Sequence, residues 1–219
     1  MKSYIITRFS IFGWTKQGFQ MTSDVNKEGY RSKLFSPLRL NHKFNVFEKI
    51  TLPSILNQTN INWEWVIYAS TFLPEEYQKR LLELTSPHPK IKCKFIDSFK
   101  EFIFEPKKCE DYCTLRLDDD DGLAPTFLEK LQPYAEKKGV IVCHSRGIKF
   151  TVDEKNEIIY GKKTRNIGIA VGLCGIGINI YDCGCHGVRL KENYTLINRN
   201  DPDMYYLCCS DYCDSKRKF

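Results

Sequence analysis

Short apolar runs alternate with amphipathic stretches along most of the chain. Apolar runs of strand length occupy residues 4–7, 63–68, 91–96, 114–117 and 140–143. Between them, residues 40–50 and the stretch after Pro74 carry apolar side chains three or four positions apart, which is the period of an amphipathic helix. Strands that alternate with helices predict an α/β fold with a mostly parallel sheet flanked by helices.

Prolines mark the starts of the predicted helices. Pro74 and Pro125 are each expected to open a helix, the second with Leu128, Leu131 and Ala135 facing inward. Pro53 has no N–H to donate and would break a helix that ran through it. The sequence therefore predicts that the helix over residues 40–50 ends before Pro53 and that another turn begins there.

The later part of the chain is less regular. Residues 150–152 and 157–160 flank Asp153–Asn156 and predict a β-hairpin. From Asn166 onward the chain is rich in glycine and cysteine, without a G-x-G-x-x-G between strand and helix. We expect a single domain over residues 1–200 and a C-terminal tail, residues 201–219, that packs on or near the active site.

Four consecutive carboxylates follow the fourth apolar run, in the segment TLRLDDDDGL at Thr114–Leu123. If the strand stays extended to its tip, Arg116, Asp118 and Asp120 project to one side and Asp119 to the other. Ligands of open α/β sheets bind at this carboxyl edge of the strands. Paired carboxylates suit Mn²⁺ or Mg²⁺ bridging to a diphosphate, and Gly122 is expected to let the backbone reverse.

Two other interpretations of the acidic segment compete with a metal site. Asp and Gly are common after strands, so the loop could simply be solvated; four carboxylates beside Arg116 favour a ligand site instead. A calcium-binding EF-hand is excluded, because Gly122 at its sixth position would put Leu117 and Leu128 where carboxylate ligands are required.

Composition narrows the class of protein. The chain has 219 residues, of which 42% are hydrophobic and 13% aromatic, as in a globular protein. Its net charge is +6, and the basic residues form short scattered clusters, so no nucleic-acid partner is expected. The N-terminus shows no secretory signal and no run approaches the ~20 apolar residues of a membrane span. The predicted location is cytoplasmic.

Cysteines gather near the C-terminus. In a reducing cytoplasm the ten cysteines are expected to be thiols. Residues that could in principle hold zinc are Cys183, Cys185, His186, Cys208, Cys209 and Cys213. No paired C-x-x-C spacing is present, so buried thiols are favoured over a zinc site.

A succession of motifs carries a family resemblance. These are Thr7-Arg8-Phe9, Leu52-Pro53-Ser54-Ile55 with Gln58-Thr59, Trp65, Leu73-Pro74, and Arg116-Leu117-Asp118-Asp119-Asp120-Asp121. In this order they resemble the rhamnosyl transferase family, which belongs with the nucleotide-sugar glycosyltransferases of GT-A fold. Beyond Gly139 the match is loose.

The resemblance implies roles for individual residues. Thr7 and Arg8 would contact the base or phosphate of the donor, and Asp118 would face the ribose or sugar. Asp120 would bind the cation and Asp121 would support the sugar. His186 is the best-placed histidine for a further metal or diphosphate ligand, and a histidine without a role is the alternative.

The implied reaction moves a sugar, rhamnose or another hexose, from a nucleoside-diphosphate donor to a hydroxyl acceptor such as a glycan. A cation on Asp120, with Arg8 and Arg116, would neutralise the departing phosphate. An inverting enzyme also needs a carboxylate base. Candidates are Asp153, Asp182 and Asp203, with Asp182 preferred because it lies beside the Gly-Cys-His segment, and a plain surface aspartate is the alternative for each.

Two departures from the family pattern leave other functions open. The second strand ends at Ser70 without the carboxylate that many relatives carry, and Cys208–Asp211 stands where relatives often have His-Gly. A haloacid-dehalogenase-like phosphatase would use Asp118 as nucleophile and Asp120 as acid/base, but would expect Thr or Val at Gly122 and its motif near the N-terminus. The third possibility is a non-catalytic domain that binds a sugar nucleotide.

Overall fold

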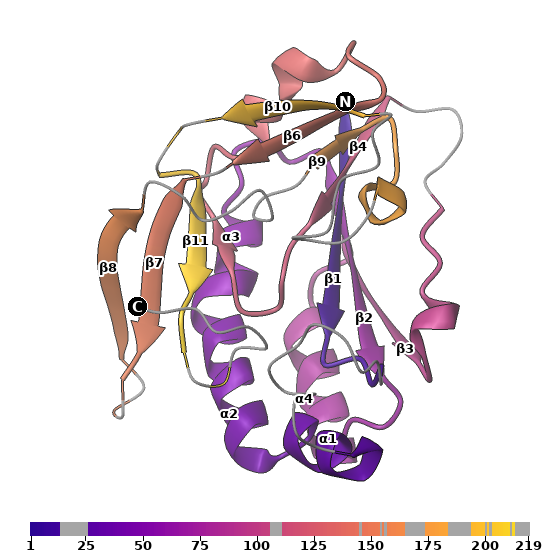
Figure 1. Ribbon diagram of the computed structural model, residues 1–219, viewed down its shortest axis with the longest axis vertical. Coiled ribbons are helices and arrows are strands. Elements are labelled where there is room, and N and C mark those ends of the chain that lie inside the picture. Colours follow the sequence, from indigo (N-terminus) through magenta and orange to yellow (C-terminus); the bar gives the residue numbers. More distant parts are fainter. Residues whose placement is uncertain are drawn as a thin grey trace.

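A seven-stranded sheet forms the centre of the computed structural model (Figure 1). The model describes residues 1–13, 26–105, 111–144, 146–153, 155, 157–164, 174–183, 194–199, 201, 203–210 and 212. The strands, in spatial order, are β10 (Thr195–Arg199), β6 (Val140–His144), β9 (Cys174–Ile176), β4 (Tyr112–Arg116), β1 (Lys2–Phe9), β2 (Trp63–Ser70) and β3 (Ile91–Ile96). Among the described strands of this seven-stranded sheet, only β9 pairs antiparallel to its neighbours, so the predicted mostly parallel sheet is confirmed.

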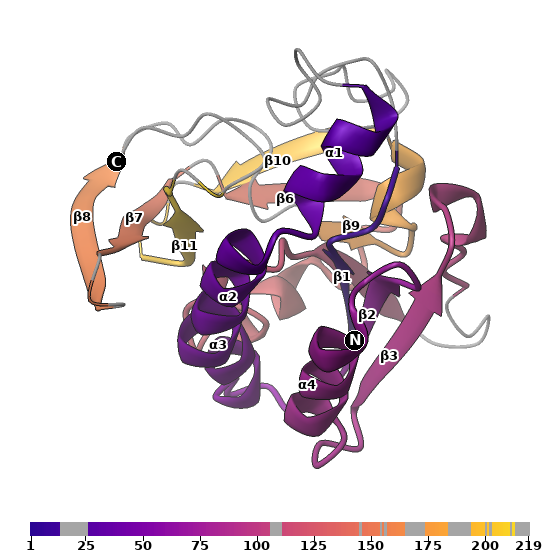
Figure 2. The ribbon, with the colours of Figure 1, turned by 90° about the horizontal axis from the view of Figure 1, so that it is seen from below.

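Helices cover one face of this sheet. They are α2 (Pro37–Val46), the π-helical η2 (Phe47–Thr51), α3 (Leu52–Leu56) and α4 (Glu75–Thr85), and α1 (Lys27–Leu34) precedes α2 along the chain. Figure 2 shows α2, α3 and α4 on one side of β1, β2 and β3. On the opposite face, Ile6, Val66 and Tyr68 pack with Phe102, just after the short helix η3 (Phe99–Glu101), and with Tyr181 of η5 (Ile180–Cys183).

A smaller sheet lies on the other side of α2 and η2. It contains β5 (Gly122–Leu123), β11 (Tyr205–Cys208), β7 (Gly147–Val152) and β8 (Ile158–Thr164), in that order. Strands β7 and β8 pair antiparallel, which confirms the predicted hairpin. Val46 and Ile50 pack against Phe150 and Cys208 of this sheet. Helix α2 and the following η2 are therefore held between the central sheet and the smaller sheet.

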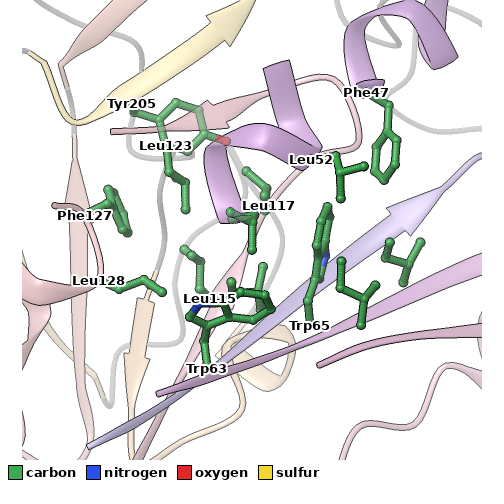
Figure 3. Close-up of a cluster of buried hydrophobic side chains, with 14 of the residues drawn as sticks. Phe47, Leu52, Trp63, Trp65, Leu115, Leu117, Leu123, Phe127, Leu128 and Tyr205 are labelled. Carbon is green, nitrogen blue, oxygen red and sulfur yellow. The ribbon is translucent and has the colours of Figure 1, made fainter. Parts of the chain in front are cut away.

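The main core fills the space between the central sheet and the helices. Alternate side chains of the strands, Trp65 on β2 and Leu115 on β4, are fully buried there with Phe47 from η2. Figure 3 shows these side chains packed together with Leu52 and Leu117. Burial of large apolar side chains contributes about 1.5–3 kcal/mol each, so this layer holds the strands of the central sheet against the helices.

The predicted new helical turn at Pro53 is confirmed, because α3 begins at Leu52 with Pro53 in its first turn, but the predicted break before it is wrong. The junction residues Phe47 and Leu52 both have right-handed helical backbone angles, so the helix continues from Pro37 to Leu56. In an α-helix, the ring of Pro53 would clash with the carbonyl of Lys49. The wider π-helical turn immediately before it accommodates the ring.

The predicted helix after Pro125 is shorter and tighter than expected. Residues Glu129–Tyr134 form the 3₁₀-helix η4 instead of an α-helix. Pro133 lies inside it and cannot donate a backbone hydrogen bond. The inward face is as predicted at Leu128 and Leu131, which are buried, whereas Ala135 is half-buried.

Candidate functional site

The acidic segment folds as a tight turn at the end of β4. Strand β4 ends at Arg116, and the Asp121 N–H donates to the Asp118 carbonyl at 3.2 Å. The prediction of an extended tip, with Asp119 and Asp120 on opposite sides, is therefore wrong. A turn closed by this hydrogen bond allows both side chains to reach the same neighbour on α2.

That neighbour is Lys43. Its Nζ lies 2.7 Å from Asp119 Oδ1 and 2.9 Å from Asp120 Oδ2. The lysine side chain is 3% exposed and each carboxylate 6%. An ammonium taken out of water needs such partners, because its desolvation costs several kcal/mol. Lys43 was not predicted as a site residue. It lies on the buried face of the amphipathic helix, however, and a lysine at such a position indicates that an anionic partner is buried beside it.

Asp118 faces a different cation. Arg116 Nε and Nη2 both lie 3.3 Å from Asp118 Oδ1. Arg116 is buried, and Asp118 is the most accessible of the four carboxylates, with 25% of its side chain exposed. Burial lowers the pKa of Arg116, but the charge of Asp118 and other neighbours more than offsets this and raises the pKa above its ordinary value.

Two arginines converge on Tyr181. The guanidinium carbon of Arg8 lies 5.4 Å from the centre of the Tyr181 ring and that of Arg116 lies 5.6 Å from it. Burial raises the pKa of Tyr181, while the positive charges of Arg116 and Arg8 act against this rise. The carboxyl ends of β1 and β4 therefore present two cations and the Asp118 carboxylate together. Tyr181 was missed because it lies in the irregular part of the sequence.

The Thr7 hydroxyl is committed to the core. Thr7 is fully buried, and its Oγ1 accepts a hydrogen bond of 2.9 Å from the indole N–H of Trp65. Its neighbour Arg8 lies on the other face of β1, with Tyr181. Any contact of Thr7 with a donor would therefore be made by its backbone.

Asp121 connects the acidic turn to the C-terminal strand β11. Its Oδ2 accepts from the Tyr205 hydroxyl and its Oδ1 from the Cys208 N–H, both at 2.9 Å. Asp121 is 1% exposed. Both oxygens of this carboxylate thus bind protein groups, and a role in supporting the sugar stays a prediction.

Gly122 is required for close packing and not for a reversed backbone. It lies in β5, and its φ is not among the positive values found at Gly139 and Gly177. A Cβ added there would lie 2.8 Å from Ile50 Cγ2. The expectation about Gly122 is therefore wrong in mechanism: the missing side chain lets η2 pack against the turn.

His42 adjoins the same cluster and was assigned no role from the sequence. Its ring centre lies 4.8 Å from that of Tyr212. Burial lowers the pKa of His42, the charge of Asp120 raises it, and those of Lys43 and Arg39 lower it. The histidine is therefore close enough to the acidic turn to sense its charges.

The other predicted site residues lie outside this cluster or outside the described chain. Asp182, in η5, is exposed. Burial, and after it the charge of Asp182, raises the pKa of Tyr112 at the beginning of β4. Asp153 caps the hairpin turn by accepting from the Lys155 and Glu157 N–H groups. Asp203 is exposed before β11. His186 lies outside the described residues, so its role stays a prediction.

No group of three or more His, Cys, Asp or Glu side chains is arranged to hold a metal in the described part of the chain. The cysteines described there are thiols, six of the seven buried. Cys185 and Cys213, which the zinc hypothesis needs, lie outside it.

The described helices include none long and apolar enough to cross a membrane.

Comparisons with known proteins agree with this geometry. A family whose description reads "Putative rhamnosyl transferase" matches residues 2–219. The chain belongs to this family. A comparison with curated proteins finds no match.

Solved structures of TarS from S. aureus share the fold of this family member. The complex with UDP has a TM-score of 0.52 at 9% identity over 96% of this chain and 61% of that one. The complex with UDP-GlcNAc has a TM-score of 0.51 at 11% identity, over 96% and 59%. Another TarS structure has a TM-score of 0.50 at 10% identity, over 96% of this chain and 37% of that one. The chain thus spans between 37% and 61% of these solved chains, and the GT-A-like fold is confirmed.

Proposed function

We propose that this chain is a glycosyltransferase that moves a sugar from a nucleoside-diphosphate donor to a hydroxyl acceptor. The observation that carries the proposal is the pair Arg8 and Arg116 at the carboxyl ends of adjacent parallel strands, beside Asp118. This edge of an open α/β sheet is where ligands bind. Membership of the rhamnosyl transferase family supports a transferase over a phosphatase that would use Asp118 and Asp120.

The main requirement of the reaction is to stabilise the negative charge that develops on the leaving diphosphate. The acceptor oxygen forms a bond to the anomeric carbon while the bond from that carbon to the diphosphate breaks, and the diphosphate leaves with the electron pair. Arg8 and Arg116 are positioned to stabilise the negative charge that grows on it, because fixed cations need little reorganisation during the reaction. Tyr181 keeps the two guanidinium groups together. Asp118, the accessible carboxylate, would accept hydrogen bonds from sugar or ribose hydroxyls.

The proton of the acceptor hydroxyl must go to a base in an inverting enzyme. Asp182 remains the proposed base from the sequence. Its exposure in η5 lets an acceptor reach it, and its charge contributes to the raised pKa values of Tyr112 and Tyr194. An Asp182→Asn variant that loses turnover but keeps its affinity for nucleotide would support this role.

The donor is proposed to carry rhamnose or another hexose. The family description supports rhamnose, and TarS, which shares the fold, has been solved with UDP-GlcNAc. The acceptor would be a glycan or another hydroxyl-bearing molecule. A cytoplasmic location and the lack of a nucleic-acid partner stay predictions from the sequence.

The predicted Mn²⁺ or Mg²⁺ also stays a prediction. Asp120, which would hold it, already offers Oδ2 to Lys43 at 2.9 Å. The residues as described therefore do not fit a metal on Asp120, and the charge stabilisation proposed above requires only Arg8 and Arg116.

Thermal unfolding with a panel of nucleotide sugars and nucleoside diphosphates tests the proposal. A ligand at 100 times its Kd should stabilise the fold by about 2.7 kcal/mol. We expect one nucleotide to stabilise the wild type and to lose most of this effect in Arg8→Met. Arg80→Met is the matched control, because Arg80 also lies over an aromatic ring, that of Phe44, but on α4. Stabilisation without turnover of any donor sugar would indicate a non-catalytic binding domain instead.

A further inference from the structure

The acidic turn contains a cation that the chain itself supplies. The Lys43 ammonium bridges Asp119 and Asp120, and all three side chains are almost completely buried. Two adjacent carboxylates that share one ammonium have much of their mutual repulsion removed. This is the electrostatic task that a divalent metal would otherwise perform at the same carboxylates.

A metal and Lys43 compete for the same oxygen. Mg²⁺ binds carboxylate oxygens at about 2.0–2.1 Å and requires a nearly octahedral set of oxygen ligands. At Asp120 Oδ2 the ammonium nitrogen already lies 2.9 Å away. A divalent ion on that oxygen would therefore be only a few ångströms from a buried positive charge, in surroundings where water screens poorly.

The helix that carries Lys43 has little freedom to withdraw it. Lys43 lies on α2, whose next residue, Phe44, is fully buried in the main core. Val46 is fully buried against the small sheet. The Thr51 hydroxyl, further along the same helix, also donates to the Asp119 carbonyl at 3.3 Å. Helix and turn are thus fixed to each other at two levels.

We propose that the Lys43 ammonium is the resident cation of the acidic turn and takes the place of a divalent metal at Asp120. Asp119 and Asp120 are then structural anions that hold the turn on α2. Asp118 remains for the ligand on the face with Arg8 and Arg116. This division gives each of the first three carboxylates a defined partner.

For catalysis the inference rests on the proposed function. If the chain transfers sugars, the charge of the departing diphosphate falls on Arg8 and Arg116, and chelators should leave nucleotide binding intact. The location of the cation itself can be tested without any nucleotide. Failure of the proposed function and failure of this inference therefore give different results.

The experiment measures the melting temperature in EDTA and with saturating MnCl₂. The variants are Lys43→Met, Asp120→Asn, Lys43→Met/Asp120→Asn, and the control Lys2→Met. Lys2 is suited as a control because it is partly buried and paired with Glu64 at 2.6 Å. We expect Mn²⁺ not to stabilise the wild type or Lys2→Met. We expect it to raise the melting temperature of Lys43→Met, whose carboxylates then lack their ammonium, and to have no effect on the double variant.

A stabilisation of the wild type by Mn²⁺ that Asp120→Asn removes would overturn the proposal, because the metal would then bind Asp120 with Lys43 present. The wild type and Asp120→Asn alone decide this point, even if Lys43→Met does not fold. A wild type that Mn²⁺ does not stabilise, and whose affinity for nucleoside diphosphate is the same in EDTA and in MnCl₂, supports the proposal. Affinity for that nucleotide that disappears in EDTA would contradict it.

Discussion

The Tyr205 hydroxyl donates to Asp121 across 84 residues of sequence and joins the C-terminal strand β11 to the acidic turn. Both side chains are almost completely buried. A hydrogen bond to a buried carboxylate is worth about 1.5–3 kcal/mol. The shape of the acidic turn therefore depends on β11, a strand that lies much later in the sequence.

Tyr205→Phe should lower the free energy of unfolding by about 1.5–3 kcal/mol, because it leaves Asp121 Oδ2 without the tyrosine hydroxyl. Urea denaturation measures the change. Tyr160→Phe serves as the control. Tyr160 is 58% exposed, so loss of its hydroxyl should change the free energy of unfolding by less than about 0.5 kcal/mol. Equal effects of the two substitutions would show that the bond to Asp121 contributes nothing.

His144 should make the fold sensitive to acid. It is buried against Phe127, and neither ring nitrogen has a hydrogen-bond partner among the described residues. Burial lowers the pKa of His144 from 6.5 to about 4. Between these values the unfolded chain binds the proton and the folded chain does not, so stability is complete above the unfolded value and falls as the pH falls.

The loss should reach about 3 kcal/mol near the folded pKa. Urea denaturation at a series of pH values from neutral to acid measures it. His144→Leu removes the titrating group and should flatten this part of the profile. An unaltered slope in His144→Leu would mean that other groups cause the acid sensitivity.

Thr7→Val tests whether the first strand contacts the donor through its hydroxyl. The substitution removes the acceptor of the Trp65 indole N–H and should cost about 1–3 kcal/mol of stability. Because the hydroxyl points into the core, the affinity for nucleoside diphosphate, measured by calorimetry well below the melting temperature, should not change. A tenfold weaker affinity would place the Thr7 hydroxyl in the donor site.

Gly122→Ala should destabilise the fold by about 1–3 kcal/mol through overpacking against Ile50. The Ile50 side chain, which the new methyl group would meet, can be shortened to alanine. A double-mutant cycle of Gly122→Ala with Ile50→Ala therefore isolates the energy of this steric clash. We expect the double variant to be more stable than the sum of the two single effects predicts. Strict additivity would mean that the strand shifts to make room without involving Ile50.

The sequence was most informative where local patterns decide the structure. Apolar runs of strand length predicted β1, β2, β3, β4 and β6, and the family resemblance predicted that Arg8, at the end of β1, and Asp118, just after β4, serve one donor site. The contact of Lys43 with Asp119 and Asp120 depends on how α2 packs between two sheets, 76 and 77 residues before its partners, and no local pattern encodes that packing. Pro53 misled because the π-helical turn before it compensates for its ring. Tyr181 lies in a segment without a clear period.

The assignment of the donor site to Arg8 and Arg116 is tested most directly by the release of nucleoside diphosphate from a panel of UDP-, GDP- and dTDP-sugars, with acceptor extracts added. The wild type should release diphosphate from one donor class well above the blank, and Arg8→Met should reduce this rate at least about tenfold, as expected for the loss of one charge-stabilising group. Arg80→Met should keep the rate. Equal rates in Arg8→Met and the wild type would contradict the assignment of the donor site to the ends of β1 and β4.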